Sequence, residues 1–293
     1  MSKKSAEILL ASVIIARSSS LLFSKIGLGS MSPFNLLGIR FCLAFFILAL
    51  IFRKRLFFVS RRDILHGAML GTSFFAVMVA ETFALRVTPS STTSFLENTA
   101  IVIVPLLNAA LCRKAPCRKA VFSAVVTLAG VAFLTLRNGF SIGGGELLCI
   151  LGALLYSIAI ILTDRLSHEG DALMLGVLQI GFMGLWAVLG SLIFEQPRLP
   201  ESATEWGVIL ALVIICSCFG FTLQPLAQKY TGAELAGQFC AFNPLTASVL
   251  GAVFMNERFG VYGLVGAALI LCGILITSLH VPSHSAAQPH GSR

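Results

Sequence analysis

The sequence predicts an all-α membrane protein with ten transmembrane helices, arranged as two inverted five-helix repeats. Three observations predict this fold: an apolar composition, a regular alternation of long apolar segments with short polar connections, and a weak internal repeat. Of the 293 residues, 57% are hydrophobic and 12% are charged, whereas a soluble domain usually carries about 25% charged residues. Ten spans of about 20 residues each would take up most of the chain, which leaves no length for a separate soluble domain.

Apolar length and polar punctuation place the spans, with ends that are accurate to about four residues. In order, they cover residues 6–27, 33–52, 64–85, 90–112, 118–136, 146–163, 172–194, 207–227, 233–255 and 259–280. The apolar run at the amino terminus is not followed by an Ala-x-Ala cleavage pattern, so we interpret it as a retained first helix rather than a signal peptide. Residues 281–293 are polar, and we expect a disordered cytoplasmic tail there.

The charges of the chain indicate topology. The net charge is +8, but the Lys and Arg residues lie in short runs between apolar segments, which is typical of membrane orientation signals. Most of these runs fall on the side of the amino terminus. We therefore expect both termini in the cytoplasm of a cell whose inner (plasma) membrane, a bacterial one, holds the protein, and we expect no nucleic-acid partner.

An internal repeat divides the chain into two halves, residues 1–137 and 138–280. Shifting the first two spans by 139 residues superposes Arg17 on Tyr156 without a gap. Because each half has an odd number of spans, the halves must cross the membrane in opposite senses. Inverted repeats of this kind place the substrate site between the halves, near the middle of the membrane.

Four ionisable residues lie inside predicted spans: Arg17, Arg40, Glu81 and Glu97. Each costs about 2.5–3.5 kcal/mol on insertion scales, so each needs a partner or a wet cavity. One interpretation is structural, with ion pairs between Arg17 and Glu97 and between Arg40 and Glu81. The other is functional: Arg17 would hold a substrate carboxylate and Glu97 an ammonium group, as suits an amino acid. A buried carboxyl group favours its neutral form, so Glu97 could also couple transport to a proton.

Uncharged side chains extend the candidate binding site. They are Asn98, Tyr156, Gln224, Gln238 and Asn243, with Phe239 and Phe242 close to Gln238 in sequence. A shift of 143 residues superposes Glu81 on Gln224, so equivalent positions are polar in both halves, as expected for one shared pocket. The alternative is that these groups only bond neighbouring helices, which is worth about 0.6 kcal/mol per contact.

Prolines and small residues mark two further features. Pro225 and Pro244 lie inside the eighth and ninth spans, where each frees a backbone carbonyl and bends its helix. They are either hinges beside the pocket or fixed bends. Small residues such as Gly130 and Gly273 form stripes on the fifth and tenth spans and allow close helix approach. We expect these helices to pack within their own halves or on each other, and a homodimer contact is a second use of the stripes.

The carboxy-terminal part of the chain resembles a known family. The stretch FNPLTASVLGAVFMNERFGVYGLVGAALILCGILI, residues Phe242–Ile276, has a proline in the ninth span, a Glu-Arg pair at a turn and a Gly-rich tenth span. It is similar to the signature of EamA-type members of the drug/metabolite transporter superfamily. The first half departs from the signature, with Ile101 at the place of Pro244. The resemblance implies a ten-helix inverted-repeat fold, a cavity lined mainly by helices 1, 3, 4, 6, 8 and 9, and export of metabolites, amino acids or amphipathic drugs.

These observations predict a secondary transporter, an exporter of small polar or amphipathic metabolites such as amino acids, that works by alternating access around a mid-membrane cavity. A carrier of nucleotide sugars or other anionic metabolites is the alternative, since Arg17 could bind an anion. An intramembrane enzyme acting on a lipid-linked substrate would need clustered nucleophiles or metal ligands, and the sequence has none at a recognisable spacing. We therefore expect no catalytic residue, metal site or cofactor, and the partners are a small-molecule substrate and the lipid bilayer.

Overall fold

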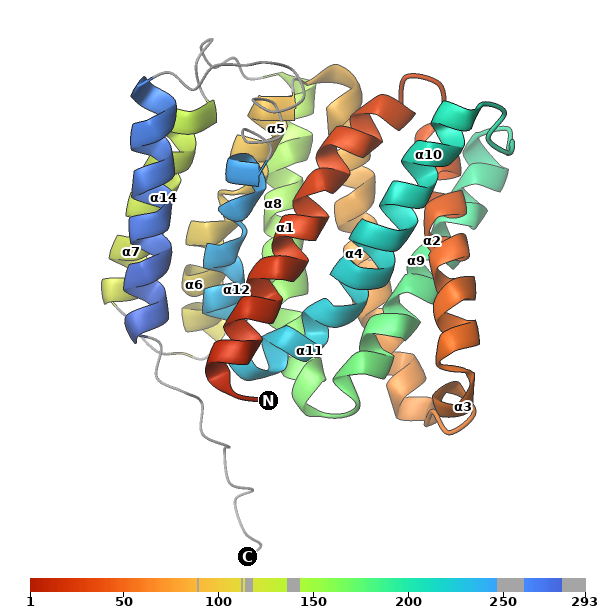
Figure 1. Ribbon diagram of the computed structural model, residues 1–293, viewed down its shortest axis with the longest axis horizontal. Coiled ribbons are helices and arrows are strands. Elements are labelled where there is room, and N and C mark those ends of the chain that lie inside the picture. The colour runs from red at the N-terminus through yellow and green to blue at the C-terminus, as the bar shows by residue number, and fades with distance from the viewer. Residues whose placement is uncertain (89, 112, 114–117, 136–142, 247–260, 281–293) are drawn as a thin grey trace, which may run out of the picture.

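The protein is described here by a computed structural model, which is all-helical in the residues it describes: 1–88, 90–111, 113, 118–135, 143–246 and 261–280 (Figure 1). Within these residues, seven helical segments are long and apolar enough to cross a membrane, and two shorter apolar helices cover Val121–Phe133 and Val265–Ile276. The ninth predicted span is described only as far as Thr246. The predicted tail and the Glu-Arg pair of residues 257 and 258 lie outside the described residues.

The helices follow one another with short connections. They are α1 (Lys3–Gly27), α2 (Pro33–Ile51), α3 (Arg53–Leu56), α4 (Arg61–Val87), α5 (Ser90–Glu97), α6 (Ala100–Leu111), α7 (Arg118–Thr135), α8 (Gly144–His168), α9 (Ala172–Phe194), α10 (Ala203–Ala211), the π-helix η1 (Leu212–Phe221), α11 (Thr222–Thr231), α12 (Ala233–Phe239) and α14 (Val261–His280).

Capping residues explain why several helices begin earlier than hydropathy predicts. Hydropathy predicts that the third span begins at residue 64, but α4 begins at Arg61. There the Asp63 carboxylate accepts from the Ser60 amide at 3.1 Å, and the Ser60 hydroxyl accepts from the Asp63 amide at 3.1 Å. This capping box satisfies two helix-end amides, so polar residues that look like loop in a hydropathy pattern form the first turn.

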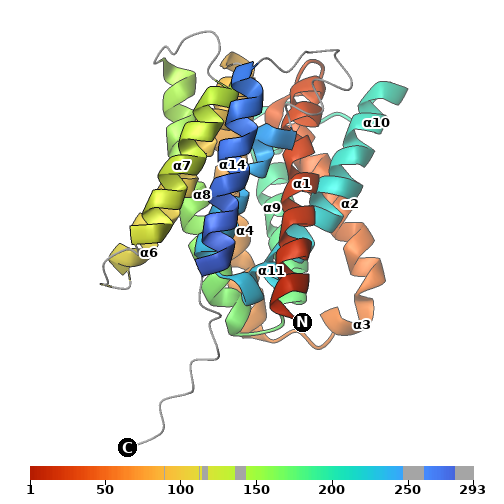
Figure 2. The same ribbon diagram turned by 60° about the vertical axis from the view of Figure 1, so that its left-hand side comes forward.

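The helices pack in pairs across the molecule. α7 lies along α14 at one edge and α2 lies along α9 at the opposite edge (Figures 1 and 2). Between these edges, α4 packs on α8, and α1 packs on η1 and α11. Large apolar side chains such as Phe46, Ile51 and Ile193 are more than half exposed on the outside, which gives a surface suited to lipid.

The small-residue stripes lie where α7 and α14 meet, which confirms that these helices pack on each other. A Cβ added at Gly130 would lie 2.8 Å from the carbonyl oxygen of Gly266. A Cβ added at Gly273 would overlap the hydroxyl of Thr127. Because the two backbones approach this closely, these glycines are used inside the chain, and the homodimer stays a prediction without support from them.

The fourth span is broken in the middle, although its sequence predicts a continuous helix. α5 ends at Glu97 and α6 begins at Ala100. Two side chains compete with the backbone at the break: Asn98 Nδ2 donates to the Ser94 carbonyl at 2.6 Å, and Thr99 Oγ1 donates to the Leu96 carbonyl at 2.6 Å. The Thr99 amide also bonds Leu96, at 3.1 Å, which is one residue short of the α-helical spacing.

The ninth span is broken at the equivalent place. α12 ends at Phe239 and helical structure resumes at Phe242. Pro244 has no amide hydrogen, so the Cys240 carbonyl, its usual acceptor, instead accepts from the Asn243 amide at 2.9 Å. With the 143-residue repeat offset, this break falls on Asn98 and Thr99 of the first half. The two halves therefore interrupt the same helix by different chemistry.

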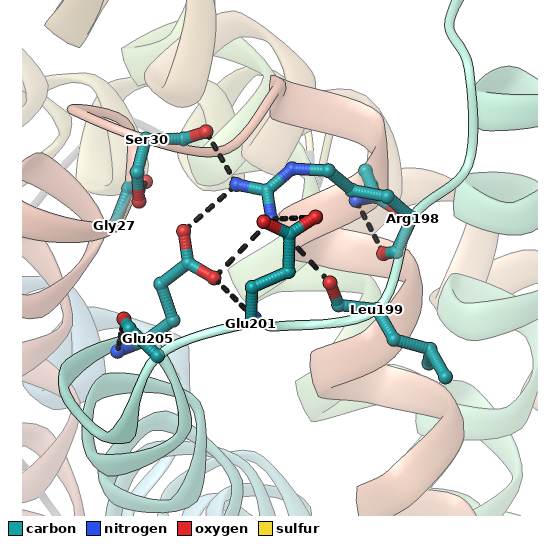
Figure 3. Close-up of polar contacts among 8 residues, drawn as sticks. Gly27, Ser30, Arg198, Leu199, Glu201 and Glu205 are labelled. Carbon is teal, nitrogen blue, oxygen red and sulfur yellow. Dashed lines mark hydrogen bonds and ion pairs between the residues drawn. The ribbon is translucent and has the colours of Figure 1, made fainter.

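A polar cluster joins the connection after α1 to the connection between α9 and α10 (Figure 3). Arg198 donates to the Glu205 carboxylate at 2.7 and 3.3 Å and to the Ser30 carbonyl at 2.7 Å. These hydrogen bonds to Glu205 raise the pKa of Arg198 above its usual value. The Glu195 carboxylate accepts from two amides of the first turn of α2, at 2.8 and 3.0 Å. The cluster thus holds the two halves together at this end of the molecule.

Candidate functional site

A small polar cavity lies inside the bundle, between α1, α4, α5, α8, η1 and the segment after α12. Its polar lining consists of Arg17, Ser18, Ser20, Glu81, Glu97, Tyr156 and Asn243. The cavity volume is about 30 Å³, room for about two water molecules and far below the roughly 300–1,000 Å³ of pockets for drug-sized ligands. A metabolite can enter only if the surrounding helices move apart, so this is a closed conformation.

Arg17 reaches from α1 of the first half to side chains of the second half. Its Nη1 donates to the Tyr156 hydroxyl at 3.2 Å and to Gln224 Oε1. Its Cζ lies 4.0 Å from the centroid of the Phe221 ring and 5.3 Å from that of Tyr156. A guanidinium over aromatic rings is stabilised by the ring quadrupoles. The structure therefore brings together Arg17 and Tyr156, which the repeat superposes.

Gly220 makes the position of Arg17 feasible. A Cβ at Gly220 would lie 2.5 Å from Arg17 Cγ, so a larger residue would displace the arginine stem. Gly220 lies in η1, and π-helical turns occur often at functional sites. Neither Gly220 nor Phe221 was among the predicted site residues, because both lie in an apolar run that is typical of an ordinary membrane helix.

Glu81 on α4 and Glu97 at the end of α5 line the same cavity. Each side chain is only 8% exposed. In the part of the chain that the structure describes, Glu97 forms no ion pair with Arg17, and its Oε1 has no hydrogen-bond partner. The predicted Arg17–Glu97 ion pair is therefore absent from this conformation, and the carboxyl groups face the cavity instead.

Arg40 does not pair with Glu81 either. Its Nε donates to Ser217 Oγ and its Nη1 to Ser20 Oγ, both at 2.9 Å, and its Cζ lies 4.8 Å from the Phe41 ring centroid. The side chain is fully buried behind the cavity. Hydroxyl groups and aromatic rings, rather than a carboxylate, surround this charge, so the structural ion-pair interpretation is wrong for this conformation.

The remaining predicted site residues divide into two groups. Asn243 lines the cavity, with its Oδ1 2.6 Å from Ser18 Oγ, and Gln224 contacts it through Arg17. Gln238 instead turns to α7, where it bonds Thr127 at 3.0 Å and Ser123 at 3.3 Å. Asn98, Phe239 and Phe242 are also absent from the cavity lining: Asn98 bonds its own helix, and the centroids of the two rings lie 5.4 Å apart, edge to face.

Pro225 bends the eighth span at a position that is held on both sides. Its missing amide frees the carbonyl of Phe221. Gln179 Nε2 on α9 donates to that carbonyl at 2.6 Å, so the freed acceptor is satisfied. Gln179 is fully buried and superposes on Arg40 in the repeat. The hinge role of Pro225 and Pro244 therefore stays a prediction, and in this conformation the Pro225 bend is fixed by a neighbouring helix.

The long apolar helices, the lipid-suited surface and the charged inner cavity define an integral membrane protein that moves a solute, a membrane transporter. The chain belongs to the EamA-like transporter family, whose model matches it twice, over residues 4–136 and 143–279. This family is part of the drug/metabolite transporter superfamily.

Relatives of this family resemble the chain over nearly its whole length. Two uncharacterized transporters of Archaeoglobus fulgidus are each 26% identical over 283 residues; the matches cover 94% and 92% of this chain and 86% and 96% of theirs. The uncharacterized transporter YetK of Bacillus subtilis is 21% identical over 287 residues, covering 93% of this chain and 86% of its own. A solved crystal structure with 20% identity has a TM-score of 0.79, covers 95% of this chain and 98% of its own, and shows the fold.

Proposed function

We propose that the protein is a secondary transporter that exports small polar or amphipathic metabolites, amino acids foremost, by alternating access around the central cavity. One observation carries the proposal. Arg17 and two carboxyl groups line one cavity inside the membrane-spanning bundle without forming ion pairs with each other. Charged groups inside a bilayer are costly and mark substrate or ion pathways, so their lack of mutual pairing favours a ligand role.

The packing supports ten spans in two inverted repeats, residues 1–137 and 138–280. α1 packs on η1 and α11, as α8 packs on α4, so the first helix of each half contacts the third span of the other. The fourth and ninth spans are interrupted at equivalent places. Discontinuous helices beside a central site are a feature of inverted-repeat transporters. α1 begins and α14 ends at the same end of the bundle (Figures 1 and 2), which supports our proposal of two cytoplasmic termini in a bacterial inner membrane.

The charges of the cavity favour a substrate that carries an amine. Its lining holds one basic side chain, Arg17, and two acidic ones, Glu81 and Glu97. A carboxylate of an amino acid would bind Arg17, and its ammonium group would lie between the glutamates. A nucleotide sugar would bring two phosphate charges towards two carboxyl groups, so the anionic-metabolite alternative has less support. A proton on Glu97 in exchange for substrate stays part of the proposal.

Transport of radiolabelled amino acids in proteoliposomes tests this function. A thermal-shift screen of the purified protein first selects the ligand, and counterflow then measures its flux. A hydrogen bond to a charged group is worth about 1.5–3 kcal/mol, and about 1.4 kcal/mol is tenfold. We therefore expect Arg17→Gln and Glu97→Gln each to lower the flux at least about tenfold.

The matched control is Glu201→Gln, which removes a carboxylate that is 81% exposed in the loop cluster and should leave the flux unchanged. Circular dichroism and size-exclusion profiles confirm that each variant is folded. Unchanged flux in both cavity variants would remove these residues from the mechanism and with them the proposed site.

A further inference from the structure

The last turn of α5 holds three buried oxygen atoms that have no hydrogen-bond partner among the described residues: Ser94 Oγ, Glu97 Oε1 and Asn98 Oδ1. Their side chains are 2%, 8% and 1% exposed. The three residues are spaced i, i+3 and i+4, which places them on one face of a helix. One helical turn thus gathers three unsatisfied oxygens in a region without bulk water.

Local hydrogen bonding fixes these oxygens as acceptors. Asn98 Nδ2 donates to the Ser94 carbonyl at 2.6 Å, so the amide oxygen of Asn98 is its free end. The break after α5 adds a backbone acceptor. The Ile101 amide, which would bond the Glu97 carbonyl in a continuous helix, donates to the Asn98 carbonyl at 3.0 Å instead. The negative end of the α5 dipole also lies here.

This set of groups has the chemistry of a cation site. Carboxylate, amide, hydroxyl and carbonyl oxygens are ligands of hard cations. The set contains one carboxylate, whose single charge balances a monovalent ion, whereas Ca²⁺ usually takes six to eight oxygens with several carboxylates. Unwound backbone and half-helix carboxyl ends coordinate Na⁺ in transporters with broken helices.

We propose that the break between α5 and α6 binds a sodium ion through Ser94, Glu97 and Asn98. Because Glu97 also lines the cavity, the bound ion would hold its carboxylate in place next to Arg17 and shape the pocket for substrate. The coupling of this ion to transport rests on the proposed function, but the binding of the ion does not.

Thermal unfolding of the purified full-length protein tests the site. The melting temperature is measured in increasing NaCl, with choline chloride keeping the ionic strength constant, and the titration is repeated with KCl. A ligand that binds only the folded state raises the melting temperature in a saturable way, so we expect a saturable rise in Na⁺. Ser94→Ala should raise the half-saturating Na⁺ concentration several-fold, and Glu97→Gln should abolish the rise.

Ser157→Ala is the matched control. Its hydroxyl is also fully buried, but it donates to the Ala153 carbonyl at 2.7 Å, so this variant should keep the wild-type Na⁺ response. Binding of ²²Na⁺ to the wild-type protein, competed by unlabelled NaCl, gives a second measurement that needs no variant. Identical melting in NaCl and choline chloride, or a Na⁺ response that survives Glu97→Gln, would overturn the site.

The outcomes for the ion and for transport are separable. Amino-acid flux without any Na⁺ effect on melting or ²²Na⁺ binding would overturn the sodium site and leave the transporter proposal intact. Saturable Na⁺ binding that depends on Glu97, together with no flux of any screened amino acid, would support the site and count against the proposed substrate class.

Discussion

Two groups of charged side chains differ in how their charges are met. In the loop cluster, Arg198 makes two hydrogen bonds to the Glu205 carboxylate and a third to the Ser30 carbonyl. In the cavity, Arg17 is met by a phenol, an amide and aromatic rings, while Glu97 keeps an oxygen without a partner in the described structure. The charges are paired where water is close and unpaired where a charge is most expensive.

The other end of the bundle follows the loop cluster. Arg62 pairs with Glu169, and Arg55 lies 3.6 Å from Asp171, so charges at the connections are again paired. An ion pair inside the bilayer would relieve a larger cost than one at its surface. Because the chain forgoes that relief only around the cavity, the comparison indicates that the loop charges hold the fold and the cavity charges serve a ligand.

The largest effect should come from displacing Arg17 without removing it. In Gly220→Val, the added side chain occupies the space of the Arg17 stem, since a Cβ alone would lie 2.5 Å from Arg17 Cγ. Overpacking of this kind costs about 1–3 kcal/mol, and we expect amino-acid counterflow to fall about tenfold or more. Flux per folded protein in proteoliposomes measures the effect.

Gly152→Ala is the control for this prediction. Gly152 is also buried in a helix, but its added Cβ would meet Ala80 Cβ at 3.6 Å, an ordinary contact, so flux should stay at the wild-type level. Adding Arg17→Gln to Gly220→Val should produce little further loss. Wild-type flux in Gly220→Val would show that the placement of Arg17 does not matter and would end the contrast between cavity and loops.

The sequence predicts the membrane fold well because apolar length determines it. The helices lie close to the predicted spans, and the repeat correctly superposes Arg17 on Tyr156, which contact each other. The predicted ion pairs are wrong because balanced charge says nothing about distance. The sequence places Gln238 at the pocket, but this residue lies on α12 just before the break and bonds α7.

Two features of the site have no clear signal in the sequence. The π-helix η1 forms in LVIICSCFGF, an apolar run whose hydropathy is the same for α- and π-helical turns. The break after Glu97 depends on Asn98 and Thr99 bonding their own backbone, a choice that these residue types leave open in an isolated helix. The contacts of Arg17 and Gly220 across helices decide such details, and a hydropathy pattern does not contain them.

An intermediate effect should come from the Pro225 bend. Gln179→Leu removes the donor to the Phe221 carbonyl and leaves a buried acceptor unpaired, at a cost of about 1–3 kcal/mol. We expect a lower melting temperature and, since Phe221 lines the cavity, a smaller loss of flux than in Gly220→Val.

The double variant Gln179→Leu with Pro225→Ala sharpens this prediction. The alanine would supply the backbone amide that proline lacks, so the double variant should satisfy the Phe221 carbonyl and recover much of the melting temperature. If the double variant melts lower than both single variants, the carbonyl is not the cause. Recovery of stability without recovery of flux would show that the bend itself is needed for transport.

The smallest effect should come from the loop cluster, which makes Arg198→Ala the sharpest test of the comparison. The Arg198 side chain is 33% exposed, and partly exposed ion pairs contribute little because water and salt screen them. We expect a small fall in melting temperature that is lost in high salt, and counterflow at the wild-type rate. Glu201→Gln, which alters a carboxylate 3.6 Å from Arg198 in the wild type, should change neither quantity. If Arg198→Ala instead lowered flux as much as Gly220→Val, the paired charges would belong to the transport cycle as a contact between the halves that must open, and pairing would no longer separate structural from functional charges in this protein.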